Sequence, residues 1–181
     1  MSREVVARRS PTGPVRRALL GRCEHVAMEP RIELLGDDAA LIDVVVGWHW
    51  REWSHDDEDA NLDGWRARLC GRTNRDRVPF TLVAHLDGEP VGCLSVCDDD
   101  LDDRFADRGP WLSGMLVIGR ARNLGVGRTL VRAAEEQARI FGLPELWLRT
   151  GEAGPFYERC GWSYVLRKEH PRDSTVMRRE L

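Results

Sequence analysis

The sequence predicts a single α/β domain built on a mixed sheet with helices on its faces. Two strand-like runs in the middle of the chain meet at Asp87-Gly88, and later strand-like runs alternate with amphipathic helical segments. The chain has 181 residues, of which 42% are hydrophobic. That is enough for one domain with a sizeable core, whereas a second domain would be cramped.

The first predicted elements are a short strand and two helices. Residues 32–35 are a strand candidate, and Asp37 stands where a helix N-cap belongs. The helix after it is expected to run to about Trp53, because apolar residues recur at spacings of three and four: Leu41, Val44, Val45 and Trp48. Asn61 caps a second predicted helix that ends near Gly71, with an inward face of Leu62, Trp65 and Leu69.

The later elements begin with a predicted β-hairpin. Residues 79–86 and 89–96 are expected to pair antiparallel, since Asp-Gly at their junction is typical of a two-residue hairpin turn. Residues 111–118 predict a central strand. The remaining expectations are a helix, a strand, a short helix and two closing strands, at residues 127–141, 146–149, 154–160, 162–166 and 175–177.

Charge and composition divide the chain into two parts. Residues 1–28 hold six arginines and few large apolar side chains, so we expect a flexible N-terminal extension before a folded domain over residues 29–181. The rest of the chain is then more acidic than the formal net charge of −3, which argues against nucleic-acid binding. Neither a membrane span nor a secretory signal is apparent, so we expect a cytoplasmic protein without a membrane partner.

The cysteines and histidines predict neither disulfides nor a metal site. The five cysteines are an odd number without CxxC pairs, and we interpret them as reduced thiols. Cys93 and Cys97 are expected to be core thiols on one face of a strand. His49, His55 and the acidic residues 56–59 lack the spacing of metal ligands.

A glycine-rich segment, residues 122–128, stands between a predicted buried strand and the start of an amphipathic helix. Glycines let a phosphate approach the backbone closely, and a helix N-terminus presents N–H groups to it. A P-loop would need Lys where Arg128 stands, and a dinucleotide fingerprint would need Gly where Leu130 stands. The segment therefore predicts a phosphate-binding loop of another kind, with an ordinary tight turn as the alternative.

A second segment gives this loop a family context. Residues 156–158 are Phe-Tyr-Glu, followed by Gly161 and Trp162, and the loop itself reads Arg-x-x-Gly-x-Gly over residues 122–127. Together they resemble the GNAT superfamily of acetyltransferases. Its signatures are Gln/Arg-x-x-Gly-x-Gly/Ala after a strand, and a Phe-Tyr-Glu helix followed by Gly and an aromatic residue. The resemblance extends from about residue 30 to the C-terminus.

The resemblance implies a GNAT-like α/β fold, a mostly antiparallel twisted sheet of six to seven strands with helices on both faces. It also implies acetyl-CoA as co-substrate, with the loop amides cradling the pyrophosphate and the central strand's main chain binding the pantetheine arm. The positions that inherit these roles are Leu116, Val117, Ile118, Arg122, Asn123, Leu124, Gly125, Val126, Gly127 and Arg128. Tyr157 inherits the position of the general acid that protonates the departing CoA thiolate. Gly119 and Thr150 stand where the family often has Pro and Asn, which bears on the fine geometry of the site.

The acceptor amine arrives mostly protonated, so a base or a water chain must remove a proton before attack. The candidates are Glu52 and His49 at the end of the first helix and the acidic residues before the central strand, among them Asp100. Of these we expect Glu52 to be the base, with Trp48 and Asp100 binding the substrate. An acidic loop that is only solvated surface is the alternative for Asp100.

The function that these features predict is acetyl transfer from acetyl-CoA to a primary amine. We expect a small, cationic acceptor rather than a protein, because acidic groups near the site could hold a cation. Two alternatives stay open: a protein lysine or N-terminal acetyltransferase, and a non-catalytic acyl-CoA-binding module. The chain is expected to act as a monomer or a homodimer.

Overall fold

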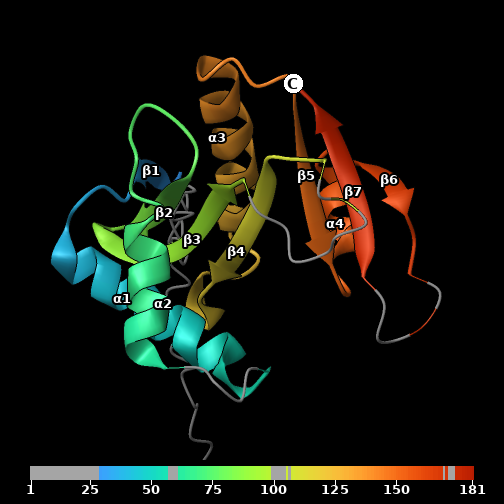
Figure 1. The fold of residues 1–181 in the computed structure, drawn as a ribbon. Helices are drawn as coiled ribbons and strands as arrows, with labels where there is room; N and C mark the ends of the chain where they lie inside the picture. The colour runs from blue at the N-terminus through green and yellow to red at the C-terminus, as the bar shows by residue number, and fades with distance from the viewer. Residues whose placement is uncertain (1–28, 57–60, 99–104, 106, 169, 171–173) are drawn as a thin grey trace, which may run out of the picture.

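The computed structural model describes residues 29–56, 61–98, 105, 107–168, 170 and 174–181 (Figure 1). The predicted N-terminal extension lies outside these residues. Over the described residues the strands are β1 (Arg31–Leu34), β2 (Phe80–Leu86), β3 (Glu89–Cys97), β4 (Trp111–Val117), β5 (Glu145–Thr150), β6 (Ser163–Leu166) and β7 (Thr175–Glu180). The helices are α1 (Ala39–Trp53), α2 (Leu62–Cys70), α3 (Val126–Ile140) and α4 (Gly154–Arg159).

The strands form one seven-stranded sheet within the described part of the chain, in the order β1-β2-β3-β4-β5-β7-β6. Every neighbouring pair is antiparallel except β4 and β5, which are parallel. Figure 1 shows β1 to β4 on one side of the molecule and β5, β7 and β6 on the other. The predicted fold class, a mixed and mostly antiparallel sheet, is therefore confirmed.

Local signals in the sequence set the turn and the helix ends. Asp87 and Gly88 join β2 to β3 with φ of 53° and 81°, the left-handed pair that a type I′ turn needs. Asn61 caps α2 as predicted, accepting from the Gly64 N–H at 2.7 Å. The predicted cap of α1 is wrong by one residue: Asp38 rather than Asp37 is the N-cap. Asp38 has extended φ and ψ, and its carboxylate accepts from the amides of Ala40 and Leu41.

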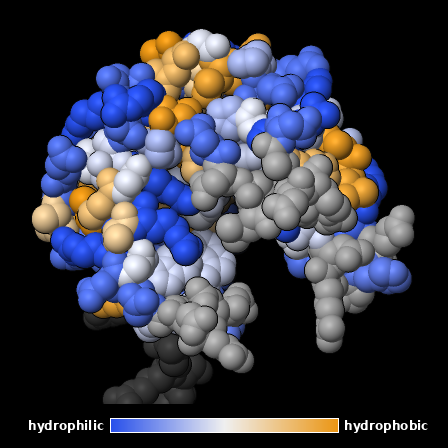
Figure 2. All heavy atoms as spheres, in the orientation of Figure 1, coloured by the Kyte–Doolittle hydropathy of each residue, from blue (hydrophilic) through white to orange (hydrophobic). Residues whose placement is uncertain are grey.

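Helices cover both faces of the sheet, and each face has its own core. Apolar residues of α3 and α4 pack on one face, among them Leu130, Val131 and Tyr157. Residues of α1 and α2, including Val45 and Leu69, pack on the other face against β2 and β3. On the surface in Figure 2, hydrophobic atoms gather at the top, where α3 ends, and beside β6. The exposed apolar side chains at these two places are Ile140, Val165 and Leu166.

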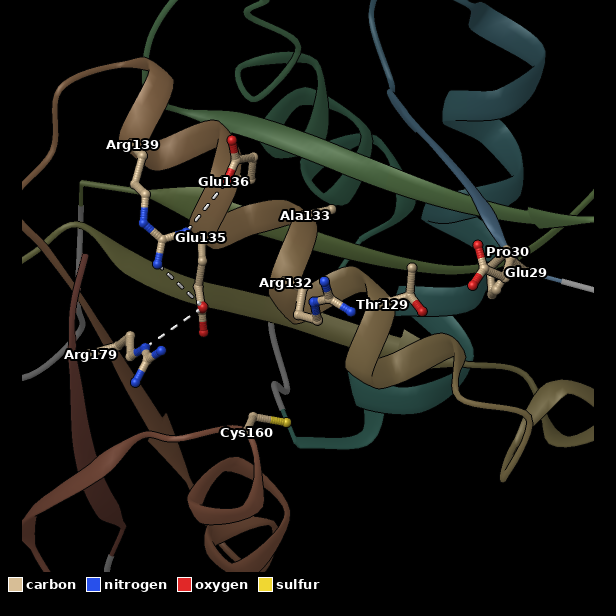
Figure 3. Close-up of a pocket in the computed structure, with 10 residues that line it drawn as sticks. All are labelled: Glu29, Pro30, Thr129, Arg132, Ala133, Glu135, Glu136, Arg139, Cys160 and Arg179. Atoms are coloured by element: carbon tan, nitrogen blue, oxygen red, sulfur yellow. Dashed lines mark ion pairs between the residues drawn. The ribbon is translucent and has the colours of Figure 1, made fainter.

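A buried carboxylate ties α3 to the C-terminal half of the sheet. Glu135 accepts a hydrogen bond from the Trp162 indole N–H at 2.9 Å. The guanidinium groups of Arg139 and Arg179 lie 3.8 and 3.7 Å from the same carboxylate (Figure 3). Glu135 is only 5% exposed, so its charge depends on these three partners. Trp162, the aromatic residue of the second motif, therefore has a structural role.

Replacing Glu135 should destabilise the fold. We expect Glu135→Ala to lower the free energy of unfolding by about 3 kcal/mol, because it leaves the buried Trp162 indole N–H without an acceptor and removes the carboxylate between two partly exposed arginines. The melting temperature should then fall by roughly 10 °C in calorimetry. Glu136→Ala is the matched control, since Glu136 is exposed on the same helix and pairs only at the surface with Arg139. Equal melting temperatures for the two variants would contradict a stabilising role for Glu135.

Candidate functional site

The site begins where β4 separates from β5. The two strands pair only at Trp111 with Trp147 and Leu112 with Leu148, although β4 continues to Val117. β4 carries one extra residue relative to β3 between Ser113 and Leu116, and Gly114 within that stretch has φ of +59°. Such a bulge bends a strand. Beyond Leu112, β4 therefore has a free edge that borders two adjoining pockets.

The first hollow, here the loop pocket, lies between the free edge of β4 and the first turn of α3. Its lining includes Glu52, Met115, Val117, Gly125, Arg128 and Tyr157. Asn123 and Gly125 have φ of 65° and 83°, so the loop turns sharply into the helix. The first hydrogen bond of α3 runs from the Thr129 N–H to the Gly125 carbonyl, and Gly125 provides no side-chain cap. The amides before Thr129 thus lack an intrahelical partner, and with the helix dipole they suit a phosphate group.

Backbone direction in β4 distinguishes the three residues predicted to contact pantetheine. The Ile118 N–H donates to the Val91 carbonyl at 3.0 Å, so Ile118 directs its backbone groups toward β3. Alternation along a strand gives Leu116 the same direction and turns Val117 toward the free edge. The Val117 carbonyl accepts from Arg122 Nε at 3.0 Å, and a carbonyl oxygen has a second lone pair for a ligand. Val117 is therefore the member of this trio whose backbone is directed toward a ligand beside β4.

The other predicted cofactor contacts differ in where they lie. Arg122, Asn123, Val126 and Gly127 line the loop pocket, as do Leu116 and the residues named above. The Val126 side chain is buried in the core, so only its backbone can contact a ligand. Leu124 is largely exposed, and neither it nor Ile118 lines the pocket.

Tyr157 stands where the two pockets meet. Its hydroxyl donates to Met115 Sδ at 3.1 Å, and its ring packs edge-on against Phe156 and Trp162. Burial raises the pKa of Tyr157 well above its usual range, so the phenol stays protonated at neutral pH. A thioether is a weak acceptor, so this hydroxyl could turn to a better one. Thr150 caps the turn before α4 by accepting from the Ala153 N–H at 3.1 Å.

The second hollow, here the arginine pocket, was not foreseen from the sequence. It is lined from α1, α2, the turn after α2 and β5 by His49, Trp53, Trp65, Arg68, Arg72 and Arg149. Met115, Ala153 and Tyr157 line both pockets, so the two are continuous at Tyr157. Trp48 lies in neither lining and is instead buried in the core beneath α1. Asp100, the other residue predicted to bind substrate, lies outside the described residues.

His49 is held in a neutral state at the wall of the arginine pocket. Burial, together with the charges of Arg72 and Arg68, lowers the pKa of His49 to about 4, against the raising effect of its bond to Gly114. Its Nε2 lies 3.2 Å from the Gly114 carbonyl, which can only accept, and 3.3 Å from Cys93 Sγ. Burial raises the pKa of Cys93 to about 12, so the thiol is not ionised. Both groups are poorly suited to proton abstraction or nucleophilic attack at neutral pH.

Three further properties concern only the described residues. Within them, no three side chains of His, Cys, Asp or Glu come together in a way that could hold a metal ion. None of their helices has the length and apolar character that crossing a membrane requires. Cys70, Cys93, Cys97 and Cys160 are free thiols there.

Comparisons with known proteins agree with this geometry. The profile of the Acetyltransferase (GNAT) family matches residues 42–162. The sequence search of curated proteins found no match. Among solved structures, an aminoglycoside 6'-N-acetyltransferase complexed with coenzyme A is similar, with a TM-score of 0.66 and 16% identity over 83% of this chain and 96% of the other.

Two other similar structures widen the range of neighbours. An acetyltransferase from Streptococcus agalactiae has a TM-score of 0.60 and 18% identity over 84% of this chain and 98% of that one. N-acetylglutamate synthase from Neisseria gonorrhoeae, solved with coenzyme A and N-acetyl-glutamate, has a TM-score of 0.57 and 14% identity, over 84% of this chain and 35% of that one. At these identities the neighbours share the fold.

The family match covers more than half of the chain, so the chain belongs to the GNAT acetyltransferase family. It is an N-acetyltransferase, and acetyl-CoA is its co-substrate. The described residues fit this co-substrate, because the loop pocket combines open helix-terminal amides with a free strand edge.

Blocking the loop should weaken acetyl-CoA binding. A Cβ on Gly125 would point into open space beside the amides, so the indole of Gly125→Trp would occupy the approach to them. We expect the Kd for acetyl-CoA, measured by calorimetry, to rise at least ~10-fold. Gly142→Trp is the matched control, since Gly142 also has positive φ and open space but follows the far end of α3. An unchanged Kd in a folded Gly125→Trp protein would contradict the placement of the phosphates.

Proposed function

We propose that the protein transfers the acetyl group to the primary amine of a small molecule by direct attack, with Tyr157 as the general acid. One observation carries this proposal: the Tyr157 hydroxyl lies at the junction of the loop pocket and the arginine pocket. A thioester bound along β4 with its phosphates at α3 would present its reacting end there. An acceptor in the arginine pocket would meet it from the other side.

Tyr157 suits the second half of the reaction. The attacking nitrogen forms a bond to the acetyl carbon, and the C–S bond then breaks with both electrons going to sulfur. The departing thiolate needs a proton, and the buried phenol holds one at neutral pH because burial raises the pKa of Tyr157. Its present partner, Met115 Sδ, is a weak acceptor that a thiolate would readily displace.

Glu52 is the proposed general base. It lies on the last turn of α1 and lines the loop pocket together with Met115 and Tyr157. Its carboxylate is exposed to solvent, so a proton taken from the amine could pass on to water. His49 is less suited to this role, because its lowered pKa of about 4 makes it a weak base.

A small acceptor is favoured by the walls of the arginine pocket. Trp53 from α1 and Trp65 from α2 stand on one side, and Ser113 and Arg149 from β4 and β5 on the other. Elements of both halves of the sheet thus bound the pocket, and small-molecule sites are generally concave clefts of this kind. A peptide would instead need an open groove along a strand edge or between helices.

Removing the Tyr157 hydroxyl should slow turnover without weakening co-substrate binding. The ring of Tyr157→Phe still packs against Phe156 and Trp162, whereas the proton donor is lost. We expect kcat to fall roughly 10²-fold or more, with the Kd for acetyl-CoA nearly unchanged. Tyr164→Phe is the control, because Tyr164 is the second of the two tyrosines and lies on β6. Equal kcat for wild type and Tyr157→Phe, with chemistry limiting, would remove Tyr157 from the mechanism.

Replacing the proposed base should also lower kcat. Glu52→Gln keeps the size and hydrogen-bonding capacity of the side chain but cannot take a proton. We expect a loss of about 10²-fold at neutral pH that shrinks as the pH rises, because more of the amine is then already neutral. Glu158→Gln, an exposed change on α4 outside both pockets, should leave the profile unaltered. A Glu52→Gln enzyme with the wild-type pH profile would mean that water or another group removes the proton.

A further inference from the structure

Three arginines from separate parts of the chain converge on the arginine pocket. Arg68 comes from α2, Arg72 from the turn after it, and Arg149 from β5 on the other side of the cleft. Among the described residues that line this pocket there is no aspartate or glutamate. The described lining therefore carries arginines and no carboxylate of its own, at the place where we propose that the acceptor binds.

The contacts of two of these arginines hold them at the pocket wall. The Arg68 guanidinium stands 5.1 Å from the centre of the Trp65 ring, a cation–π contact. Arg72 donates to Ser113 Oγ at 3.5 Å, which links the turn after α2 to the free edge of β4. The positive charges of Arg68 and Arg72 act on His49, because they lower its pKa in addition to the effect of burial. Both charges therefore act at the part of the pocket wall that His49 forms.

A guanidinium has the geometry to bind a carboxylate. Its five N–H groups form a planar fork that can donate two parallel hydrogen bonds to the two oxygens. Arg72 and Arg149 also interact with other groups of the protein, and each guanidinium has five N–H donors in all. Two or three such forks around one pocket favour an anionic group over a cationic one.

Aromatic rings provide the apolar part of the same pocket. Trp53 and Trp65 stack with 6.5 Å between ring centres and 12° between planes, and His49 packs edge-on against both. Both tryptophans are half-buried, so each has surface left for a ligand. The pocket therefore offers a flat hydrophobic surface beside its positive charges.

We propose that the acceptor is a small primary amine that also bears a carboxylate and an apolar side chain, as an aromatic α-amino acid does. This inference rests on the acetyl transfer proposed above and names its substrate class. The carboxylate pairs with the guanidinium groups of Arg68, Arg72 and Arg149. The apolar side chain lies against Trp53 and Trp65, and the amine points toward Tyr157.

This arrangement also favours the reactive form of the amine. Nearby positive charge disfavours –NH₃⁺, so the arginines lower the pKa of the acceptor's amine and help the base remove the proton. The neutral nitrogen then bonds to the acetyl carbon, sulfur leaves with the electron pair, and the Tyr157 hydroxyl gives that sulfur its proton. A polycationic amine would be repelled by the same charges.

Matched amines test the charge preference directly in the wild-type protein. Thiol release is measured with phenylalanine against phenethylamine, tryptophan against tryptamine, and with kanamycin as a polycation. We expect each amino acid to exceed its decarboxylated partner in kcat/KM by roughly 10-fold or more. If the decarboxylated amines or kanamycin are acetylated as well or better, the carboxylate inference is overturned while the acetyl transfer stands. If acetyl-CoA binds but no amine is acetylated, the proposed transfer fails, and this inference with it.

Variants then test which arginines bind the carboxylate of the acceptor. Arg68→Gln and Arg149→Gln should each raise the KM for the amino acid roughly 10- to 100-fold, the loss expected for hydrogen bonds to a charged group. The KM for the decarboxylated partner should not rise, because that amine has no carboxylate to lose. The Kd for acetyl-CoA should not change, and Arg68→Lys should restore part of the loss. Arg66→Gln is the control, because Arg66 lies on the same helix, pairs with Asp43 and is outside the pocket. Equal losses for both amines would show a structural role and overturn the assignment.

Discussion

The parting of β4 from β5 is the constraint on which the site depends. Their parallel pairing stops after Leu112, and the bulge at Gly114 directs the rest of β4 away from its neighbour. A closed sheet would have buried this edge and filled the space between the strands. The open edge instead exposes the Val117 backbone and leaves room for two pockets that share Met115 and Tyr157. The proposed reaction would thus take place in a gap within the sheet.

Close packing at one point couples the phosphate loop to the proposed acid. A Cβ on Gly127 would lie 2.8 Å from Met115 Cε and 3.4 Å from the Phe156 ring, so a glycine lets α3 start close to β4 and α4. Met115 is also the hydrogen-bond partner of Tyr157. Gly127, the second glycine of the loop motif, is therefore needed for close packing. Gly125, the first, is needed for the turn because its φ is positive. The same short motif therefore forms the proposed phosphate site and packs against Met115, the residue that contacts Tyr157.

Neighbours with the same fold are associated with molecules of different charge. One similar structure is named for aminoglycosides, which are polyamines, and another was solved with N-acetyl-glutamate, which is acidic. The fold alone consequently does not define the acceptor. In this chain the described lining of the arginine pocket, where we propose that the acceptor binds, contains arginine and aromatic side chains, and the buried neutral His49 adds no charge to it at neutral pH. The cationic acceptor expected from acidic groups near the site does not follow from that lining.

Much of the fold could be predicted from the sequence because its signals are local. Asn61 and the Asp87-Gly88 turn act through neighbouring backbone groups, and the spacing of apolar residues in α3 identifies its buried face. The loop and Phe-Tyr-Glu motifs indicated the family for the same reason. The predicted N-cap of α1 was wrong by one residue because Asp37 and Asp38 are adjacent and either aspartate is a favourable cap. Which of them caps the helix depends on where the first helical turn begins.

What the sequence by itself determined was therefore the set of elements, the family and the segments that line the loop pocket; the binding roles of those segments stay predictions. Tertiary structure alone decided which side of α1 faces the site, with Trp48 in the core and Trp53 at the arginine pocket. It also brought Arg68 and Arg72 opposite Arg149, some 80 positions further along the chain. The spacing of residues in the sequence does not predict that these arginines lie near one another. Their proximity depends on the strand order and on the point where β4 separates from β5, and both arise from long-range strand pairing.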